Sequence, residues 1–243
     1  MILTYLRRSM LSGVGLILTV AACGGSAPTS KMADEAPETD ASDGERKSGI
    51  RMSSELGGLN EAKVNETFES SIRELQGCLS RGANRIEFLG GAVSFFLEVD
   101  EAGQVSQAYL EQSSLGDRKT EKCMLGALKT KSWPKPVGGK VGHARKSFDF
   151  DPPNDVRPPT EWGSENVEKA LAEKASAIDE CKDGSRGTFT ATMYVDTEGN
   201  PIAVGVTPPD DDGERAVDCL VDVLKQSQYP SPGSWPAKVT FSL

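Results

Sequence analysis

The chain has 243 residues, of which 37% are hydrophobic and 26% are charged, and its formal net charge is -9. This length suits one large or two small domains, and the composition is typical of a globular protein rather than a multipass membrane protein. His143 is the single histidine, so a metal site or proton relay that needs two imidazoles is excluded. The acidic balance disfavours nucleic-acid binding, which requires a concentrated positive field.

The first residues have the features of an export signal. Arg7 and Arg8 precede an apolar stretch that ends in Ala21, Ala22 and Cys23. A basic start, an apolar run too short to span a bilayer and a small-residue cleavage site are typical of a secretory signal peptide. We therefore predict that residues 1–22 are a signal peptide that is removed.

The end of this segment, Val-Ala-Ala-Cys, resembles the lipobox of bacterial lipoproteins. The resemblance implies that Cys23 is lipidated and anchors the protein to a membrane. Because Gly24 rather than aspartate follows, the anchor is expected in the outer membrane, with the protein facing the periplasm or the cell surface. The alternative is an ordinary secreted protein in which Cys23 carries no lipid.

Residues 23–60 are rich in small, acidic and chain-breaking residues and lack apolar periodicity. Such a segment buries too little apolar surface to offset its loss of conformational entropy. We predict a disordered tether with a root-mean-square reach of roughly 35 Å.

The rest of the chain contains an internal repeat at a constant offset of 96 residues. The matching pairs are Gly91 with Gly187, Val99 with Val195, Asp100 with Asp196, Gly103 with Gly199, Cys123 with Cys219, Leu128 with Leu224, Lys129 with Lys225, Pro134 with Pro230 and Pro136 with Pro232. We predict two copies of one module, residues 61–150 and 161–243, joined by a proline-rich linker at 151–160.

Each copy has the same predicted order of elements. Apolar residues at helical spacing predict a first helix over 61–79 or 166–181; the two apolar stripes are Val64, Phe68, Ile72, Leu75 and Leu79, and Val167, Leu171, Ala175 and Ile178. A second helix is predicted over 117–131 or 213–227. Between the two helices, a pair of β-rich runs joined by a glycine-containing turn predicts a hairpin, and a short alternating strand closes each copy. The predicted fold is α+β: two tandem α-β-β-α-β modules, each with a three-stranded antiparallel sheet and both helices on one face.

Four cysteines remain after Cys23, an even number in an exported chain, as a disulfide framework requires. Cys78 and Cys181 lie near the ends of the first helices, and Cys123 and Cys219 lie inside the second helices. Of the three possible pairings, duplication selects Cys78 with Cys123 and Cys181 with Cys219. Closing loops of 45 and 38 residues stabilises the fold by roughly 4 kcal/mol each in the chain-entropy model. Redox-active thiols and a metal site are alternatives, although no Cys-x-x-Cys spacing supports either.

The first copy resembles the AgmX/PglI C-terminal domain, a TonB-C-like module of myxobacterial gliding and envelope proteins. The residues that carry the resemblance are Cys78, Gly91, Ala92, Val93, Val99, Asp100, Gly103, Val105, Ser113, Ser114, Leu115, Gly116, Asp117, Cys123, Trp133, Pro134, Pro136, Phe148, Asp149 and Phe150. The second copy diverges, with Pro201 in its middle run, Pro208 to Asp212 in place of Ser-Ser-Leu-Gly-Asp, and Tyr229 in place of the tryptophan.

This resemblance implies a protein-interaction or mechanical-coupling module in a gliding-motility or energy-transduction complex, with no enzymatic activity and no cofactor. TonB-type domains add an extended partner segment to an open sheet edge, so the expected partner is a periplasmic protein or peptide segment. We expect the first copy to be the better recipient, because Pro201 weakens the ladder of the second. The alternative function is binding of peptidoglycan or another glycan.

The two copies also differ in charge. Residues 61–150 carry 13 Lys and Arg against 12 Asp and Glu, net +1, whereas residues 161–243 carry 7 against 15, net -8. We therefore expect the copies to bind different partners. Basic residues gather toward the end of the first copy and either face an anionic surface or acidic module or are simply solvated; they are Lys129, Lys131, Lys135, Lys140, Arg145 and Lys146.

Overall fold

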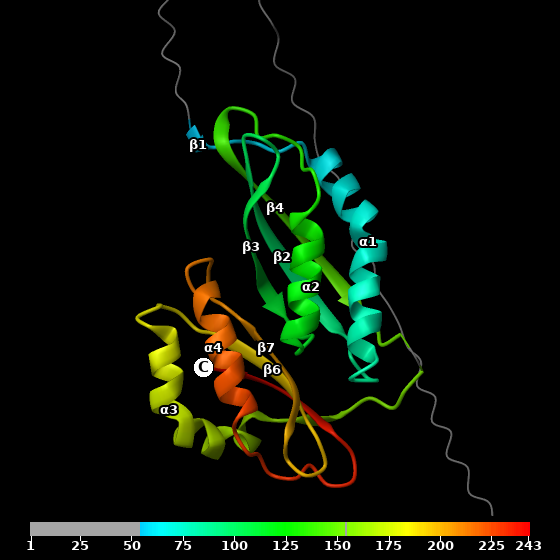
Figure 1. The fold of residues 1–243 in the computed structure, drawn as a ribbon, viewed down its shortest axis with the longest axis vertical. Coiled ribbons are helices and arrows are strands. Elements are labelled where there is room, and N and C mark those ends of the chain that lie inside the picture. The colour runs from blue at the N-terminus through cyan, green and yellow to red at the C-terminus, as the bar shows by residue number, and fades with distance from the viewer. Residues whose placement is uncertain (1–53, 154) are drawn as a thin grey trace, which may run out of the picture. The chain divides into compact units, whose positions relative to one another are not determined.

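The computed structural model describes residues 54–153 and 155–243 (Figure 1). This part of the chain contains four α-helices and two four-stranded sheets, so the predicted mixed α+β class is confirmed. The predicted signal peptide and lipidation site at Cys23 lie outside the described residues. None of the described helices is both long enough and apolar enough to cross a membrane.

The first sheet and its helices are formed by residues 54–150. Their elements are β1 (Ser54–Leu56), α1 (Glu61–Ala83), β2 (Gly91–Asp100), β3 (Val105–Ser113), α2 (Arg118–Lys129) and β4 (Gly139–Phe150). The strand order is β1-β4-β2-β3, in which β1 is parallel to β4 and the other pairs are antiparallel. The N-caps of α1 and α2 are Asn60 and Asp117, whose side chains accept bonds from Lys63 N–H and Thr120 N–H.

The second sheet and its helices follow after the proline-rich segment. Their elements are β5 (Thr160–Trp162), a 3₁₀ turn η1 (Ser164–Asn166), α3 (Glu168–Lys182), β6 (Thr190–Val195), β7 (Pro201–Thr207), α4 (Glu214–Lys225) and β8 (Ala237–Ser242). The strand order is β5-β8-β6-β7, with β5 parallel to β8. β5 begins at the last residue of the predicted linker.

Two predictions are wrong: the number of strands in each sheet and the end of the tether. Each sheet has four strands rather than three, because β1 and β5 add a short parallel strand at the edge. The predicted tether 23–60 also extends too far, since β1 pairs with β4, and Gly58 forms an isolated bridge with Val137. The chain can approach β4 closely here because residue 57 is a glycine, and a β-carbon on it would lie 2.9 Å from the Gly139 nitrogen.

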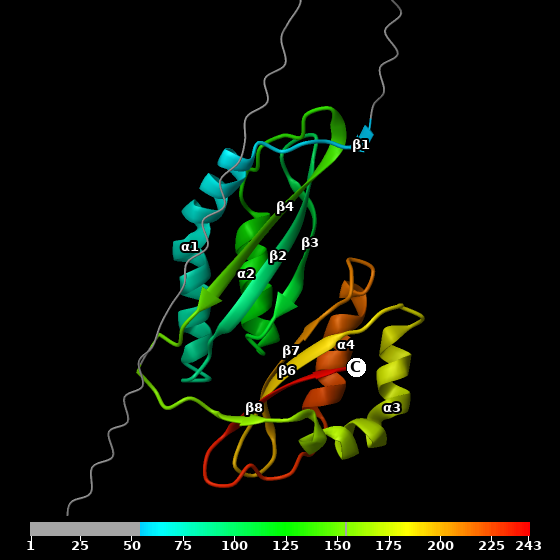
Figure 2. The ribbon, with the colours of Figure 1, turned by 180° about the vertical axis from the view of Figure 1, so that it is seen from behind.

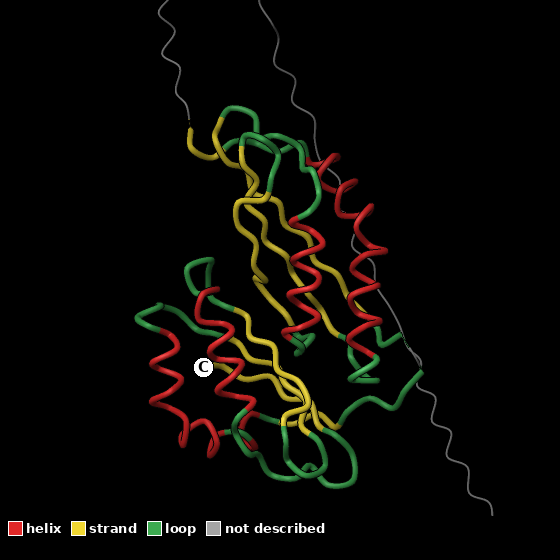
Figure 3. Tube along the Cα trace, in the orientation of Figure 1, coloured by secondary structure: helices red, strands yellow, loops and turns green. Residues whose placement is uncertain are grey.

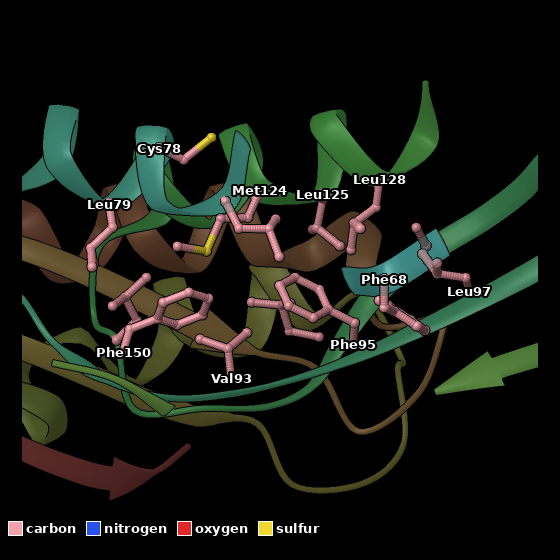
Figure 4. Packing of buried hydrophobic residues seen from close by; sticks show 14 of the residues in the cluster. Phe68, Cys78, Leu79, Val93, Phe95, Leu97, Met124, Leu125, Leu128 and Phe150 are labelled. Carbon is pink, nitrogen blue, oxygen red and sulfur yellow. The ribbon is translucent and has the colours of Figure 1, made fainter. Parts of the chain in front are cut away.

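The first sheet buries one face under α1 and α2, which lie side by side (Figures 1 and 3). Alternate residues of β2 belong to this core and are fully buried; they are Val93, Phe95, Leu97 and Val99. Figure 4 shows Val93, Phe95 and Leu97 with Phe68 of α1. The Phe68 ring contacts the Trp133 ring edge to face at 4.8 Å. The predicted α1 stripe is therefore the inner face of the helix.

Several local contacts recur 96 residues apart. Trp133 N–H donates to the Gly103 carbonyl, and Tyr229 N–H donates to the Gly199 carbonyl. The side chains of both aromatic residues also bond to a carbonyl of the preceding helix, Trp133 Nε1 to Leu128 and Tyr229 Oη to Leu224. Both glycines have positive φ and no room for a side chain beside those aromatic carbonyls.

Two disulfides are present, Cys78–Cys123 and Cys181–Cys219, which is the predicted pairing. The first joins α1 to α2, and the second joins α3 to α4. Each bond therefore closes within its own part of the chain.

The two sheets also contact one another, and the described residues belong to one compact unit. Tyr194 of β6 and Ala203 of β7 point away from α4 and belong to the first hydrophobic core. The Tyr194 ring lies 5.4 Å from the Phe88 ring, and its hydroxyl donates to the Gly90 carbonyl. The face of the second sheet that is turned away from α4 therefore packs against residues of the first part of the chain (Figure 2).

Candidate functional site

Strand β4 is paired along nearly its whole length on one side only. On the inner side, β2 pairs with it from Val141 to Phe150. On the outer side, the described β1 pairs only with Gly139 to Val141. In the part of the chain that the structure describes, no strand pairs with the outer side of residues 142–150, which we call the β4 edge.

The backbone of the β4 edge is oriented for strand addition. Gly57 N–H donates to the Val141 carbonyl at 2.6 Å, which fixes the outward direction at that residue. Backbone groups alternate in direction along an antiparallel ladder, so His143, Arg145 and Ser147 also present N–H and C=O outward. An exposed row of this kind is a template for another strand.

A cavity of about 490 Å³ opens beside the β4 edge, where β1 ends. Its lining comes from the turn after β1, the start of α1 and the first half of the edge, including Leu59, Val64 and His143. Gly142 makes this turn possible, because a β-carbon there would lie 2.6 Å from the Leu59 side chain. The cavity can accept a side chain of a segment that continues the line of β1.

The long side chains of the edge are held by partners within the molecule. Arg145 lies over the Phe96 ring at 4.5 Å and donates from Nε to Glu111 at 2.8 Å. Lys146 Nζ donates to the Asn65 side chain at 2.9 Å. These contacts hold both side chains beside the edge and fix the surface around its free backbone groups.

The opposite edge of the same sheet, β3, is flanked by acidic residues from the second part of the chain. A cavity of about 370 Å³ between them is lined by Tyr109, Asp211 and Asp212. Burial, followed by the charges of Glu111 and Asp211, raises the pKa of Tyr109. Asp211 and Asp212 therefore leave less room for an added strand along β3 than there is along the β4 edge.

The second sheet offers a shorter edge, for a reason that differs from the prediction. Pro201, which was expected to weaken this ladder, occupies the first position of β7, where sheets tolerate proline, and it pairs with Val195. The limiting strand is β8, whose outer side is covered by β5 from Ala237 to Val239 and leaves three residues free.

The predicted group of basic residues serves several local contacts. Lys131 pairs with Glu74, and Arg145 and Lys146 have the partners given above. Lys129 lines the cavity beside β3, together with Asp211. This distribution disagrees with a single docking surface for an anionic partner.

Sequence reasoning missed the cations that contact the acidic second half, Arg118 and Lys122 of α2. Arg118 is buried and donates to Glu214 at 2.6 Å and to Asp218 at 2.9 Å, and Lys122 donates to Asp218 at 2.7 Å. Burial raises the pKa of Asp218, but bonds from Lys122 and Arg118 outweigh burial, so the net shift is downward. The difference in net charge between the copies was the available signal.

Glu121 lies at the same seam and was also missed. Its side chain is buried against the backbone of Gly205 in β7, where a β-carbon would come within 2.5 Å of Glu121 Oε1. Ser113 donates to Oε1, while Oε2 has no partner. Burial raises the pKa of Glu121 to about 7, against the lowering effect of the Ser113 bond and of Arg118.

Among the described residues, no group of three or more His, Cys, Asp or Glu side chains is arranged to hold a metal ion. Comparison with protein-family models, with curated proteins and with solved structures gave no match. Function is therefore inferred from the residues and their geometry.

Proposed function

We propose that this protein is a non-enzymatic envelope lipoprotein that binds an extended segment of a periplasmic protein at the β4 edge. The observation that carries the proposal is the row of outward backbone groups from His143 to Ser147, beside a cavity of about 490 Å³. The chain's own β1 already adds to this strand next to the free part. Backbone bonds would supply affinity, and the cavity would supply selectivity for a side chain.

The proposal includes two tandem copies of one module, of which the second has diverged. It is supported by the equivalent strand orders β1-β4-β2-β3 and β5-β8-β6-β7, and by the disulfide between the two helices of each copy. The paired contacts of Trp133 and Tyr229 support it as well. Because the β8 edge is short, we assign partner binding to the first copy.

The resemblance to AgmX/PglI C-terminal domains suggests the setting, a gliding-motility or energy-transduction complex. The lipobox-like ending at Cys23 suggests an outer-membrane anchor on the periplasmic side. The competing function, peptidoglycan or glycan binding, gains no support from Phe96 and Tyr109 of the first sheet or from Trp133 after α2, because all three are at least nine-tenths buried.

The test places a photo-crosslinking amino acid on the edge, at Asp149, in the full-length protein in the producing cells. The control position is Glu173 on α3, which is also exposed. We expect a protein adduct from Asp149 and not from Glu173. Ser147→Pro in the same background removes an outward N–H and should abolish the adduct, whereas Ser147→Ala should retain it.

Adducts that form equally from both positions, or that survive Ser147→Pro unchanged, would contradict binding at the β4 edge. Retention on peptidoglycan sacculi that is equal for Ser147→Pro and the unmodified protein, without a protein adduct, would favour the glycan-binding alternative.

A further inference from the structure

The two disulfides have different electrostatic surroundings. Arg81 Nη2 lies 2.8 Å from Cys123 Sγ and 3.3 Å from Cys78 Sγ, so one guanidinium contacts both sulfurs. For Cys181–Cys219, the described residues place no cation in hydrogen-bonding contact with either sulfur. Its sequence neighbours are of mixed charge: Glu180 and Lys182 flank Cys181, and Asp218, which precedes Cys219, is paired with Arg118 and Lys122.

The charge of Arg81 is available to the first disulfide. Among the ion pairs of the described residues, none joins Arg81 to a carboxylate, although Arg85, just after α1, and Arg118 on α2 do have such partners. The side chain lies over Gly77, where a β-carbon would stand 3.5 Å from Nη1. This is an ordinary van der Waals distance, so the guanidinium lies against the helix backbone at Gly77.

Solvent exposure alone predicts that Cys181–Cys219 is the more reactive disulfide. Cys78 is 2% exposed and Cys123 is half-buried, whereas Cys219 is exposed and Cys181 is 9% exposed. If access to solvent decided, thiols would attack Cys181–Cys219 first. A neighbouring guanidinium acts in the other direction, because it stabilises the thiolate that leaves and attracts the thiolate that attacks.

We propose that Cys78–Cys123 is a thiol-exchange site, attacked at Cys123 by small thiols or cysteine thiolates, and that Cys181–Cys219 is the inert structural bond. The incoming thiolate forms a new S–S bond to Cys123 Sγ, the less buried sulfur of the pair. The Cys78–Cys123 bond breaks, and its electron pair stays on Cys78 Sγ as a thiolate beside Arg81 Nη2. A second small thiolate can then attack the small-thiol sulfur of the mixed disulfide, which forms a disulfide between the two small thiols and releases Cys123 as a thiolate, so both cysteines end reduced.

The experiment treats the full-length mature protein with increasing glutathione, in its native state at neutral pH. Free thiols are then alkylated, and peptide mapping quantifies each disulfide separately. We expect Cys78–Cys123 to exchange on the order of tenfold faster than Cys181–Cys219. The glutathione adduct should be found on Cys123 rather than Cys78.

The variant Arg81→Gln removes the charge, and Arg73→Gln, at an exposed position of the same helix, is the matched control. We expect Arg81→Gln to slow exchange at the first disulfide toward the rate of the second, and Arg73→Gln to leave it unchanged. Arg81→Lys keeps a charge and should retain part of the rate. Circular dichroism confirms that each variant is folded before its rate is compared.

Preferential attack on Cys181–Cys219, or equal rates for Arg81→Gln and Arg73→Gln, would overturn the proposal. Both outcomes are independent of partner binding at the β4 edge.

Discussion

Glu121 occupies a site that favours the neutral carboxylic acid over the carboxylate. Its side chain is fully buried between α2 and β7, with one oxygen bonded to Ser113 and the other without a partner. Arg118 is the one nearby cation that favours ionisation, while Asp117 and Glu214 oppose it. Ionisation of Glu121 therefore opposes contact between the two parts of the chain.

The raised pKa of Glu121 makes stability depend on pH. The folded protein holds this proton up to about pH 7, whereas the unfolded chain releases it near pH 4.5. The free energy of unfolding should therefore fall by about 3 kcal/mol as pH rises from 4.5 to 7, and stay lower above that. Urea unfolding at pH 5 and pH 7.5 measures this difference.

Glu121→Gln should remove most of this pH dependence and be more stable than the unmodified protein at pH 7.5. Glu87→Gln, at an exposed position, should behave like the unmodified protein. An unchanged pH profile in Glu121→Gln would show that another group is responsible.

Arg118 holds two carboxylates of α4 from a buried position. Arg118→Ala would leave Glu214 and Asp218 without this partner at a partly desolvated seam. We expect a loss of about 2 kcal/mol of unfolding free energy, less than for a fully buried pair because the Asp218 side chain is 55% exposed. Lys122→Ala, which removes an exposed ion pair with the same carboxylate, should cost less than about 1 kcal/mol. Similar losses in the two variants would contradict this difference.

At the scale of elements, the junction between β1 and β4 depends on one glycine and not on its neighbour. A β-carbon on Gly57 would lie 2.9 Å from the Gly139 nitrogen, whereas one on Gly58 would meet nothing within 4 Å. Gly57→Ala should therefore loosen β1, and Gly58→Ala should not. Hydrogen exchange of the Val137 N–H, which donates to the Gly58 carbonyl, measures the effect; equal protection in both variants would contradict it.

The longer elements were predictable because their periodicity is local. The stripe on α1 placed Val64, Phe68 and Leu75 in the core, and all three are buried. The second helices begin and end within two residues of the predicted bounds. The apolar stripe predicted for α3 was wrong at Ala175, which is exposed. The helix packs through Ala170 and Ile178.

The short strands and the choice of edge were not predictable, because they depend on approaches between distant residues. β1 has three residues, too few to show alternation, and it forms because Gly57 can approach Gly139. The family resemblance predicted an open sheet edge in the first copy without identifying the strand. Identifying the strand requires two contacts between distant residues: Asp211 and Asp212 lie beside β3, and the outer side of β4 is unpaired by the described strands beyond Val141.

At the scale of the whole described chain, the two sheets share a core residue. Tyr194 belongs to β6 but packs with Phe88 and other residues of the first core. Neither disulfide crosses between the two sheets. The stability of one part is therefore coupled to the other through side-chain contacts rather than through a covalent crosslink.

Tyr194→Ala should destabilise both parts together. Loss of a fully buried aromatic ring costs about 3 to 5 kcal/mol, and the loss should appear in the hydrogen exchange of β2 as well as β6. Tyr194→Phe removes only the bond to the Gly90 carbonyl and should cost about 1 kcal/mol. Exchange that changes in β6 alone would show that the two sheets unfold independently.

The parallel pairing of β1 with β4 also decides where tension enters the molecule. Ser54 is the first residue of β1, and everything N-terminal to it, including Cys23, connects to the described protein through this strand. With the proposed lipid anchor at Cys23, tension from the membrane would load the Gly57–Val141 hydrogen bond and the Gly58–Val137 bridge before it reached a disulfide. Detachment of β1 would also free the outer side of residues 139–141 of β4. Tension on the N-terminal segment would therefore lengthen the β4 edge, the proposed binding site.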